Sequence, residues 1–195
     1  MLASIHPLGE RARHNRFWVT ATAHMAGSVA GGAVAGGIAG TIGAGLWAIA
    51  SPTPVVVAWL AVIVCLSAAL ADASGRRLPG ARRQVDDDWL HRYRGWVYGA
   101  GFGFQLGMGV VTIVTTAAVY ATFALAALTG SVAAGIALGA MFGATRAATL
   151  LAASRVSDPA RLRLLHRRVA AAAPYARIAT IATLMATAVL VVTAG

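Results

Sequence analysis

Five long apolar stretches divide this chain, and arginines gather only in every second connector between them. The stretches are residues 17–50, 55–73, 95–128, 132–153 and 176–194. Each can cross the hydrocarbon core of a bilayer, which requires about 20 residues of helix. Only helices satisfy their own backbone polar groups in lipid without closing a barrel, and these alanine-rich runs have no two-residue period. We therefore predict an all-α, polytopic membrane helix bundle with five transmembrane helices.

The composition agrees with a bilayer as the solvent. Of the 195 residues, 58% are hydrophobic and only 11% are charged, against about 25% charged residues in soluble domains. The net charge of +10 is also typical of nucleic-acid-binding proteins, but every cation is an arginine and all except Arg146 lie in or beside the connectors. Cytoplasmic flanks of membrane helices have this same bias. We expect no nucleic-acid partner.

The arginines also predict a topology. They cluster at 11–16, 76–94 and 155–177, whereas the connectors at 51–54 and 128–131 carry no charge. If basic flanks stay in the cytoplasm, an even number of crossings must separate one cluster from the next, and two crossings each time satisfy this condition. The amino terminus is then cytoplasmic and the carboxyl terminus extracytoplasmic.

This topology divides the chain into a short tail and one membrane domain. Residues 1–16 form a basic cytoplasmic N-terminus, in which we find no apolar core of a cleavable signal peptide. Residues 17–195 form a single transmembrane domain, with cytoplasmic loops near 74–94 and 154–175.

Glycine spacing predicts close helix contacts. The stretches 17–50 and 95–128 would each be about 51 Å long as continuous helices, against about 30 Å of hydrocarbon, so they must tilt, protrude or break. Both contain small residues four apart, which let helix backbones approach closely. The packing positions that we select are Gly27, Gly31, Gly36, Gly40, Gly99 and Gly103. The alternative is a flexible glycine and alanine helix without such contacts.

Polar groups inside the apolar stretches define a candidate pathway, because such groups are costly in lipid. Gln105 lies about ten residues into its stretch, roughly 15 Å from the inner face. Glycines that weaken the helix follow it, and then threonines whose hydroxyls can satisfy freed backbone groups, so we predict a break near the midplane. The candidate pathway residues are Gln105, Gly107, Gly109, Thr112, Thr115, Thr116, His24 and Arg146.

Each polar candidate has a structural alternative. Gln105 could form an interhelical hydrogen bond that only holds the bundle together, and Arg146 could extend to the membrane surface. His24 could bond a neighbouring carbonyl, since no second histidine or carboxylate stands at metal-ligand spacing. His24 and Arg146 each lie about seven residues from the inner boundary and could share one depth.

The sequence carries no pattern typical of catalysis. We expect no enzyme activity, no cofactor and no metal site. Cys65 is the only cysteine, and we interpret it as a small core residue, since one thiol cannot exchange dithiols within the chain. The acidic run 86–88 precedes a basic and aromatic segment, where Asp88 can pair with Arg92 at the start of a helix. A divalent-cation site is the alternative, but further oxygen ligands are lacking nearby.

The last connector predicts an interfacial helix. Asp158 is placed to cap it and Pro159 to open it. Four arginines would then meet anionic lipid headgroups, namely Arg161, Arg163, Arg167 and Arg168. The lipid bilayer is therefore the first expected partner.

Two segments hint at an inverted repeat. GSVAGGAVAGG at 27–37 and GSVAAGIALGA at 130–140 share six of eleven letters. They open the first and the fourth apolar stretch, which cross in opposite directions under the predicted topology, as inverted repeats require.

On four segments the chain resembles the cytochrome c biogenesis and thiol-disulfide transmembrane family typified by CcdA and the membrane domain of DsbD. FWVTATAHMAGSVAGGAVAGG (17–37) corresponds to the second helix of that family, and RGWVYGAGFGFQLGMGVVTIVTTAAVY (94–120) is similar to the fourth. ALGAMFGATRAATLLAA (137–153) is similar to the fifth, and 167–192 to the sixth. The resemblance implies two inverted triplets of helices in a bacterial plasma membrane. This chain would lack the first helix.

The resemblance does not extend to the redox chemistry. The cysteine in the family's fourth helix would fall near Thr115 and Thr116, where this chain has none, and its partner cysteine belongs to the absent helix. Two functions remain: a small-solute or ion permease without dithiol chemistry, or a non-catalytic structural or assembly subunit of a membrane complex. A bundle short of one helix would also expose a groove for a membrane partner or a second copy, giving a homo-oligomer joined by the glycine faces.

Overall fold

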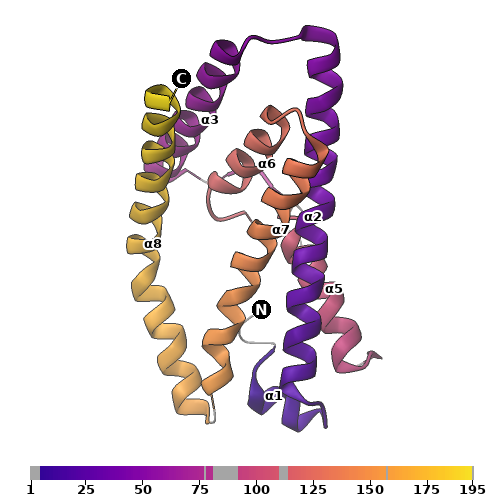
Figure 1. Cartoon of the computed structure of the whole chain (residues 1–195). Coiled ribbons are helices and arrows are strands. Elements are labelled where there is room, and N and C mark those ends of the chain that lie inside the picture. The colour runs from indigo at the N-terminus through magenta and orange to yellow at the C-terminus, as the bar shows by residue number, and fades with distance from the viewer. Residues whose placement is uncertain (1–4, 77, 81–91, 110–113, 157, 195) are drawn as a thin grey trace.

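The computed structural model describes residues 5–76, 78–80, 92–109, 114–156 and 158–194 (Figure 1). Its helices are α1 (Pro7–Ala12), α2 (Phe17–Ala50), α3 (Pro54–Ser74), α5 (Gly95–Gly107), α6 (Ala118–Leu128), α7 (Val132–Ala148), the 3₁₀ helix η1 (Thr149–Arg155) and α8 (Pro159–Ala194). No strand occurs among these residues. The prediction of an all-α fold is confirmed for them.

Among the described residues, four helices are long and apolar enough to cross a membrane. They are Phe17–Ala50, Pro54–Ser74, Val132–Ser154 and Pro159–Thr193. The remaining predicted stretch, 95–128, forms two shorter helices, α5 and α6, with a break between them. The chain is thus compatible with a multi-pass membrane protein, while a fifth crossing made by α5 and α6 together stays a prediction.

Local sequence signals set where these helices begin. The Thr53 side chain accepts a hydrogen bond from the Val56 N–H at the start of α3, and Pro54 occupies the first helical position. Ser131 caps α7 in the same way by accepting from the Ala134 N–H. These residues satisfy amides that a helix start leaves without intrahelical partners.

Helix α2 is the centre of the first of two groups of helices, which we name the glycine group (α2, α5 and α7). Helix α5 runs parallel to α2, because Gly99, Gly103 and Gly107 face successive turns of α2 at Thr20, His24 and Ser28. A Cβ at Gly103 would overlap the His24 carbonyl oxygen. Van der Waals contact of this closeness holds helices together in lipid, where apolar burial gives no driving force.

Helix α7 packs on another face of α2 and runs antiparallel to it. Gly32 faces Gly139, and Gly36 faces Gly135. In the alignment of the two similar segments Gly32 corresponds to Gly135 and Gly36 to Gly139, so these two contacts are related by a local two-fold axis. Any antiparallel helix pair has such an axis, and the inverted repeat therefore stays a prediction.

The selected packing glycines all lie at these contacts. Gly27 and Gly31 meet the backbone of α5 at Ala100 and Phe104, and Gly99 and Gly103 meet α2. Gly36 and Gly40 meet the start of α7. These glycine faces are occupied by helix contacts within one chain, and the expected homo-oligomer stays a prediction.

The second group, which we name the alanine group, consists of α3, α6 and α8. Its buried core includes Val62, Cys65 and Ala69 of α3, Ala121 of α6 and Leu184 of α8. Cys65 is fully buried there, which confirms its interpretation as a core residue. Helix α6 also contacts α2 and α7, so the broken stretch passes from the glycine group to the alanine group.

Helices α2, α5, α6 and α8 run in one direction along the bundle, and α3 and α7 run in the other (Figure 1). The α2–α3 and α6–α7 connectors lie at one end, whereas α1 and the α7–α8 connector lie at the other. The start of α2 and the end of α8 consequently lie at opposite ends, which is the arrangement that an odd number of crossings requires. The side of the membrane on which each end lies stays a prediction.

The helix that begins in the last connector is longer than predicted. Asp158 accepts a hydrogen bond from the Arg161 N–H at 2.8 Å and Pro159 begins the helix, so the predicted cap is confirmed. The helix is not a short interfacial one, however, because α8 continues for 36 residues through Pro174. Alanines flank Pro174 closely and no glycine lies nearby to end the helix, so the lost hydrogen bond bends or weakens α8 without breaking it.

The acidic run 86–88 lies outside the described residues, so its predicted role is not addressed by the fold.

We expect a single methyl group at Gly36 to destabilise the bundle. In Gly36→Ala the new Cβ would overlap the Gly135 carbonyl oxygen, whereas Gly45, on the same helix, has nothing within 4 Å of the position of a Cβ. Overpacking of this kind costs about 1–3 kcal/mol, while Gly45→Ala should be neutral or stabilising by up to about 1 kcal/mol. Thermal unfolding of both variants in detergent, followed by circular dichroism, measures the difference; equal unfolding temperatures would contradict the close α2–α7 contact.

Candidate functional site at the helix break

The break in the third apolar stretch begins at the predicted glycines. Helix α5 ends at Gly107, and Gly109 has a φ of +72°, a conformation that favours glycine. A Cβ at Gly109 would also lie 3.0 Å from side-chain atoms of Phe123 and Val119. The chain becomes helical again at Ala118. Thr112 lies outside the described residues.

A carboxylate from another helix holds the start of α6. Asp72, near the end of α3, is only 6% exposed. Its Oδ1 accepts a hydrogen bond from the Ala117 N–H at 2.6 Å, and its Oδ2 accepts one from the Thr116 hydroxyl at 2.5 Å. A helix start carries unsatisfied amides and a partial positive charge, so this carboxylate both completes the hydrogen bonding and complements the charge.

An arginine from α8 holds the end of α3. The Arg177 guanidinium donates to the carbonyl oxygen of Asp72 through Nε at 2.6 Å and also through Nη2, which further donates to the Ala73 carbonyl at 3.0 Å. Carbonyls at a helix end lack intrahelical partners and favour a cation. Asp72 therefore joins three helices, α6 through its side chain and α8 through its backbone.

A cavity of about 840 Å³ lies beside this junction. Its polar lining consists of Asp72, Arg76, Thr115, Thr116, Arg177 and Thr180. Leu78 and a run of small residues on α8, including Ala172 and Ala173, supply an apolar wall. We call this space the inner cavity, because its rim carries arginines of the clusters that we predict to be cytoplasmic.

The structure separates the predicted pathway residues into two places. Thr115 and Thr116 line the inner cavity. Gln105 is half-buried on α5, and no hydrogen bond joins its amide to another described residue. The interhelical hydrogen bond considered for Gln105 is thus not seen in the described part of the chain.

His24 and Arg146 belong to the glycine group and do not line the inner cavity. Ser28 of α2 donates a hydrogen bond to the Gly143 carbonyl of α7 at 2.8 Å, and both candidates lie about one turn beyond this bond toward the α1 end of the bundle. They share one level, as expected. His24 is 2% exposed, and the Arg146 guanidinium lies over the Phe142 ring at 5.4 Å.

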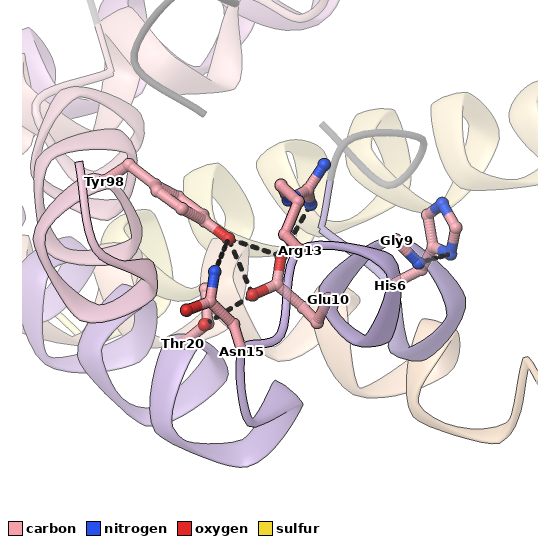
Figure 2. Close-up of polar contacts among 7 residues, drawn as sticks. All are labelled: His6, Gly9, Glu10, Arg13, Asn15, Thr20 and Tyr98. Carbon is pink, nitrogen blue, oxygen red and sulfur yellow. Dashed lines mark hydrogen bonds and ion pairs between the residues drawn. The ribbon is translucent and has the colours of Figure 1, made fainter. Parts of the chain in front are cut away.

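A second buried carboxylate ties the N-terminal segment to the bundle (Figure 2). Glu10 of α1 is fully buried. The Tyr98 hydroxyl reaches both of its oxygens at 2.6 Å, the Thr20 hydroxyl donates at 2.7 Å, and Arg13 forms an ion pair at 2.6 Å. Residues 1–16 are thus not merely a basic tail, because their described part folds against α2 and α5.

The same contacts act on Arg13. Partial burial lowers the pKa of its guanidinium, but the hydrogen bonds and charges of Glu10 and Tyr98 outweigh this effect and raise the pKa above its usual value. Arg13 therefore remains a cation. The Ile5 side chain is buried beside this cluster, among Phe17, Phe102 and Leu150. Apolar packing therefore also holds the N-terminal segment against the bundle.

Asp72 and Glu10 were not predicted from the sequence. Asp72 had a usable signal, since it is the only acidic residue within the five apolar stretches, and a lone carboxylate at such a position needs a partner. Glu10 stands among arginines in a polar segment, where nothing in the spacing distinguishes it from a solvated residue. Its burial depends on Tyr98, which lies 88 positions away along the chain.

Comparisons with known proteins identify no relative: no family model, curated protein or solved structure matches this chain.

We expect Asp72→Ala to loosen the start of α6. The change leaves the Ala117 N–H and the Thr116 hydroxyl without their acceptor, and hydrogen bonds to a charged group contribute about 1.5–3 kcal/mol each. Hydrogen exchange of the amides at the beginning of α6 should become faster, while exchange in α2 should not. Asp158→Ala removes an exposed carboxylate at another helix start and serves as the control. Unchanged exchange in α6 would show that Asp72 does not hold this helix.

Proposed function

We propose that this protein is a small-solute or ion permease of a bacterial plasma membrane, built on a CcdA/DsbD-like scaffold without dithiol chemistry. Its amino terminus would be cytoplasmic and its carboxyl terminus extracytoplasmic. Helices α5 and α6 would together form the third of five crossings, and the scaffold would be the remnant of an inverted three-plus-three repeat.

The observation that carries this proposal is the inner cavity beside a broken membrane segment. Discontinuous helices in transporters place helix ends and freed backbone groups at the solute site. Here α6 begins at Thr116 and Ala117, next to the Asp72 carboxylate, and Thr115 and Thr116 line the inner cavity. An irregular backbone at this depth is tolerated where it lines a cavity, which agrees with a passage for polar solutes.

The single thiol argues against electron transfer. Cys65 is buried between α3, α6 and α8, and the positions where the resembled family carries its reactive cysteine are threonines that line the inner cavity. Hydroxyls exchange hydrogen bonds with a solute and do not form disulfides. The proposal therefore keeps the scaffold of that family and replaces its chemistry by passage of a solute.

In this proposal Gln105 is the polar group that a solute would meet between the break and the glycine group. It stands two residues before the end of α5, and its amide has no described hydrogen-bond partner. An amide in that situation can bond water or a solute on its way from the inner cavity into the bundle.

We expect Gln105→Leu and Thr116→Val to lower flux through proteoliposomes at least about tenfold, because each removes a polar group from the pathway. Potassium, chloride and proton movements, followed with ion-sensitive dyes, and swelling in amino acid or sugar solutions are the probes. Thr183→Val is the control, since Thr183 is exposed on α8 and bonds only its own helix.

Unchanged flux in Gln105→Leu would count against this pathway. If the wild-type protein moves none of the probes and co-purifies in mild detergent with a stoichiometric membrane protein, the chain is instead a non-catalytic assembly subunit.

A further inference from the structure

We propose that the inner cavity is a binding site for a phosphate-type oxyanion, carried either by an anionic phospholipid headgroup or by a free solute. This inference concerns binding alone. It holds whether or not the bundle transports a solute, and its test does not require flux.

The balance of charge in the inner cavity favours an anion. One carboxylate and two guanidinium groups line it, those of Asp72, Arg76 and Arg177. The carboxylate already accepts hydrogen bonds from Thr116 and Ala117 and faces the positive end of α6. Neither arginine forms an ion pair with a carboxylate of the described residues. An excess of positive charge therefore remains at the cavity.

Arg177 is already held in position for such a ligand. Its Nε and Nη2 are bonded to neutral carbonyls at the end of α3, so the planar guanidinium is oriented while its charge is not neutralised. The remaining N–H groups can donate to an oxyanion, and guanidinium matches the geometry of phosphate oxygens. Less conformational entropy is lost on binding when the side chain is fixed beforehand.

Arg76 supplies the second cation, and Thr115 an additional donor. Arg76 follows the end of α3 and is exposed, and Thr115 is exposed before the start of α6. Two arginines and a hydroxyl around one space form the usual surroundings of a bound phosphate. A purely structural role of Arg177 as the cap of α3 would explain neither the second arginine nor the cavity.

The other wall suits the apolar part of a lipid. Val169, Ala172, Ala173 and Ala176 of α8 line it, and their short side chains leave space beside the arginines. Basic pockets between membrane helices on the cytoplasmic side bind anionic headgroups in this manner. The volume of about 840 Å³ exceeds what a bare phosphate needs, and it can also accommodate the glycerol of a headgroup.

The test measures binding to the full-length protein in a neutral detergent. The probes are short-chain phosphatidylglycerol, phosphatidylcholine of the same chain length, and inorganic phosphate. We expect saturable binding of one phosphatidylglycerol and weak binding of phosphatidylcholine. Arg76→Gln should weaken phosphatidylglycerol binding at least about tenfold, because it removes a charged hydrogen-bond donor.

Arg11→Gln is the matched control. It makes the same change of charge at an exposed residue of α1 that does not line the cavity, and it should alter binding by less than about twofold. Circular dichroism of each variant checks that the helices remain folded. Arg76 is preferred to Arg177 for this test, because Arg177 also caps α3.

The outcomes distinguish the two sources. Binding of phosphatidylglycerol that inorganic phosphate does not displace identifies a lipid headgroup site. Binding of inorganic phosphate with the same dependence on Arg76 identifies a free oxyanion. Equal affinity for both lipids together with no phosphate binding, or equal losses in Arg76→Gln and Arg11→Gln, would overturn the proposal.

Discussion

The direct contact of helix backbones along α2 is the interaction on which the rest of this bundle depends. In lipid, helices gain nothing by burying apolar side chains, so close van der Waals contact must hold them. Gly32 and Gly36 bring α7 against α2, and Gly103 and Gly107 of α5 do the same on another face. Because α5 and α7 pack on two faces of α2, their positions along α2 are fixed. The end of α5, where the third stretch breaks, is therefore fixed as well.

The break between α5 and α6 places polar groups and the inner cavity inside the bundle. Helix α5 remains with the glycine group, whereas α6 contacts α2 and α3 and contributes to the buried core of the alanine group. Two helix ends at this junction have a partner of opposite charge, with Asp72 at the start of α6 and Arg177 at the end of α3. The inner cavity lies beside these partners, so the same residues that make the break tolerable also supply the groups that a solute or headgroup would meet.

Sequence reasoning succeeded where a local pattern sets the structure. The small-residue spacing placed Gly36 at a helix contact, the Gly107 and Gly109 pair marked the break, and Asp158 was found as a cap. It failed where burial depends on distant segments. The Asp72 bond to Thr116 joins residues 44 positions apart, and no local spacing reveals it. The continuity of α8 through Pro174 was not predicted: a proline removes one helix hydrogen bond, whereas the alanines around it favour the helix.

The most direct test of this account is whether α5 and α6 together cross the membrane once, in the direction of α2. Single cysteines at Ser51 and Thr129, placed in a Cys65→Ser background, report the connectors after α2 and after α6. An Arg76→Cys variant reports the end of α3. We predict that a membrane-impermeant maleimide labels Ser51→Cys and Thr129→Cys from the same side and Arg76→Cys only from the other. Labelling of Ser51→Cys and Thr129→Cys from opposite sides would contradict the account.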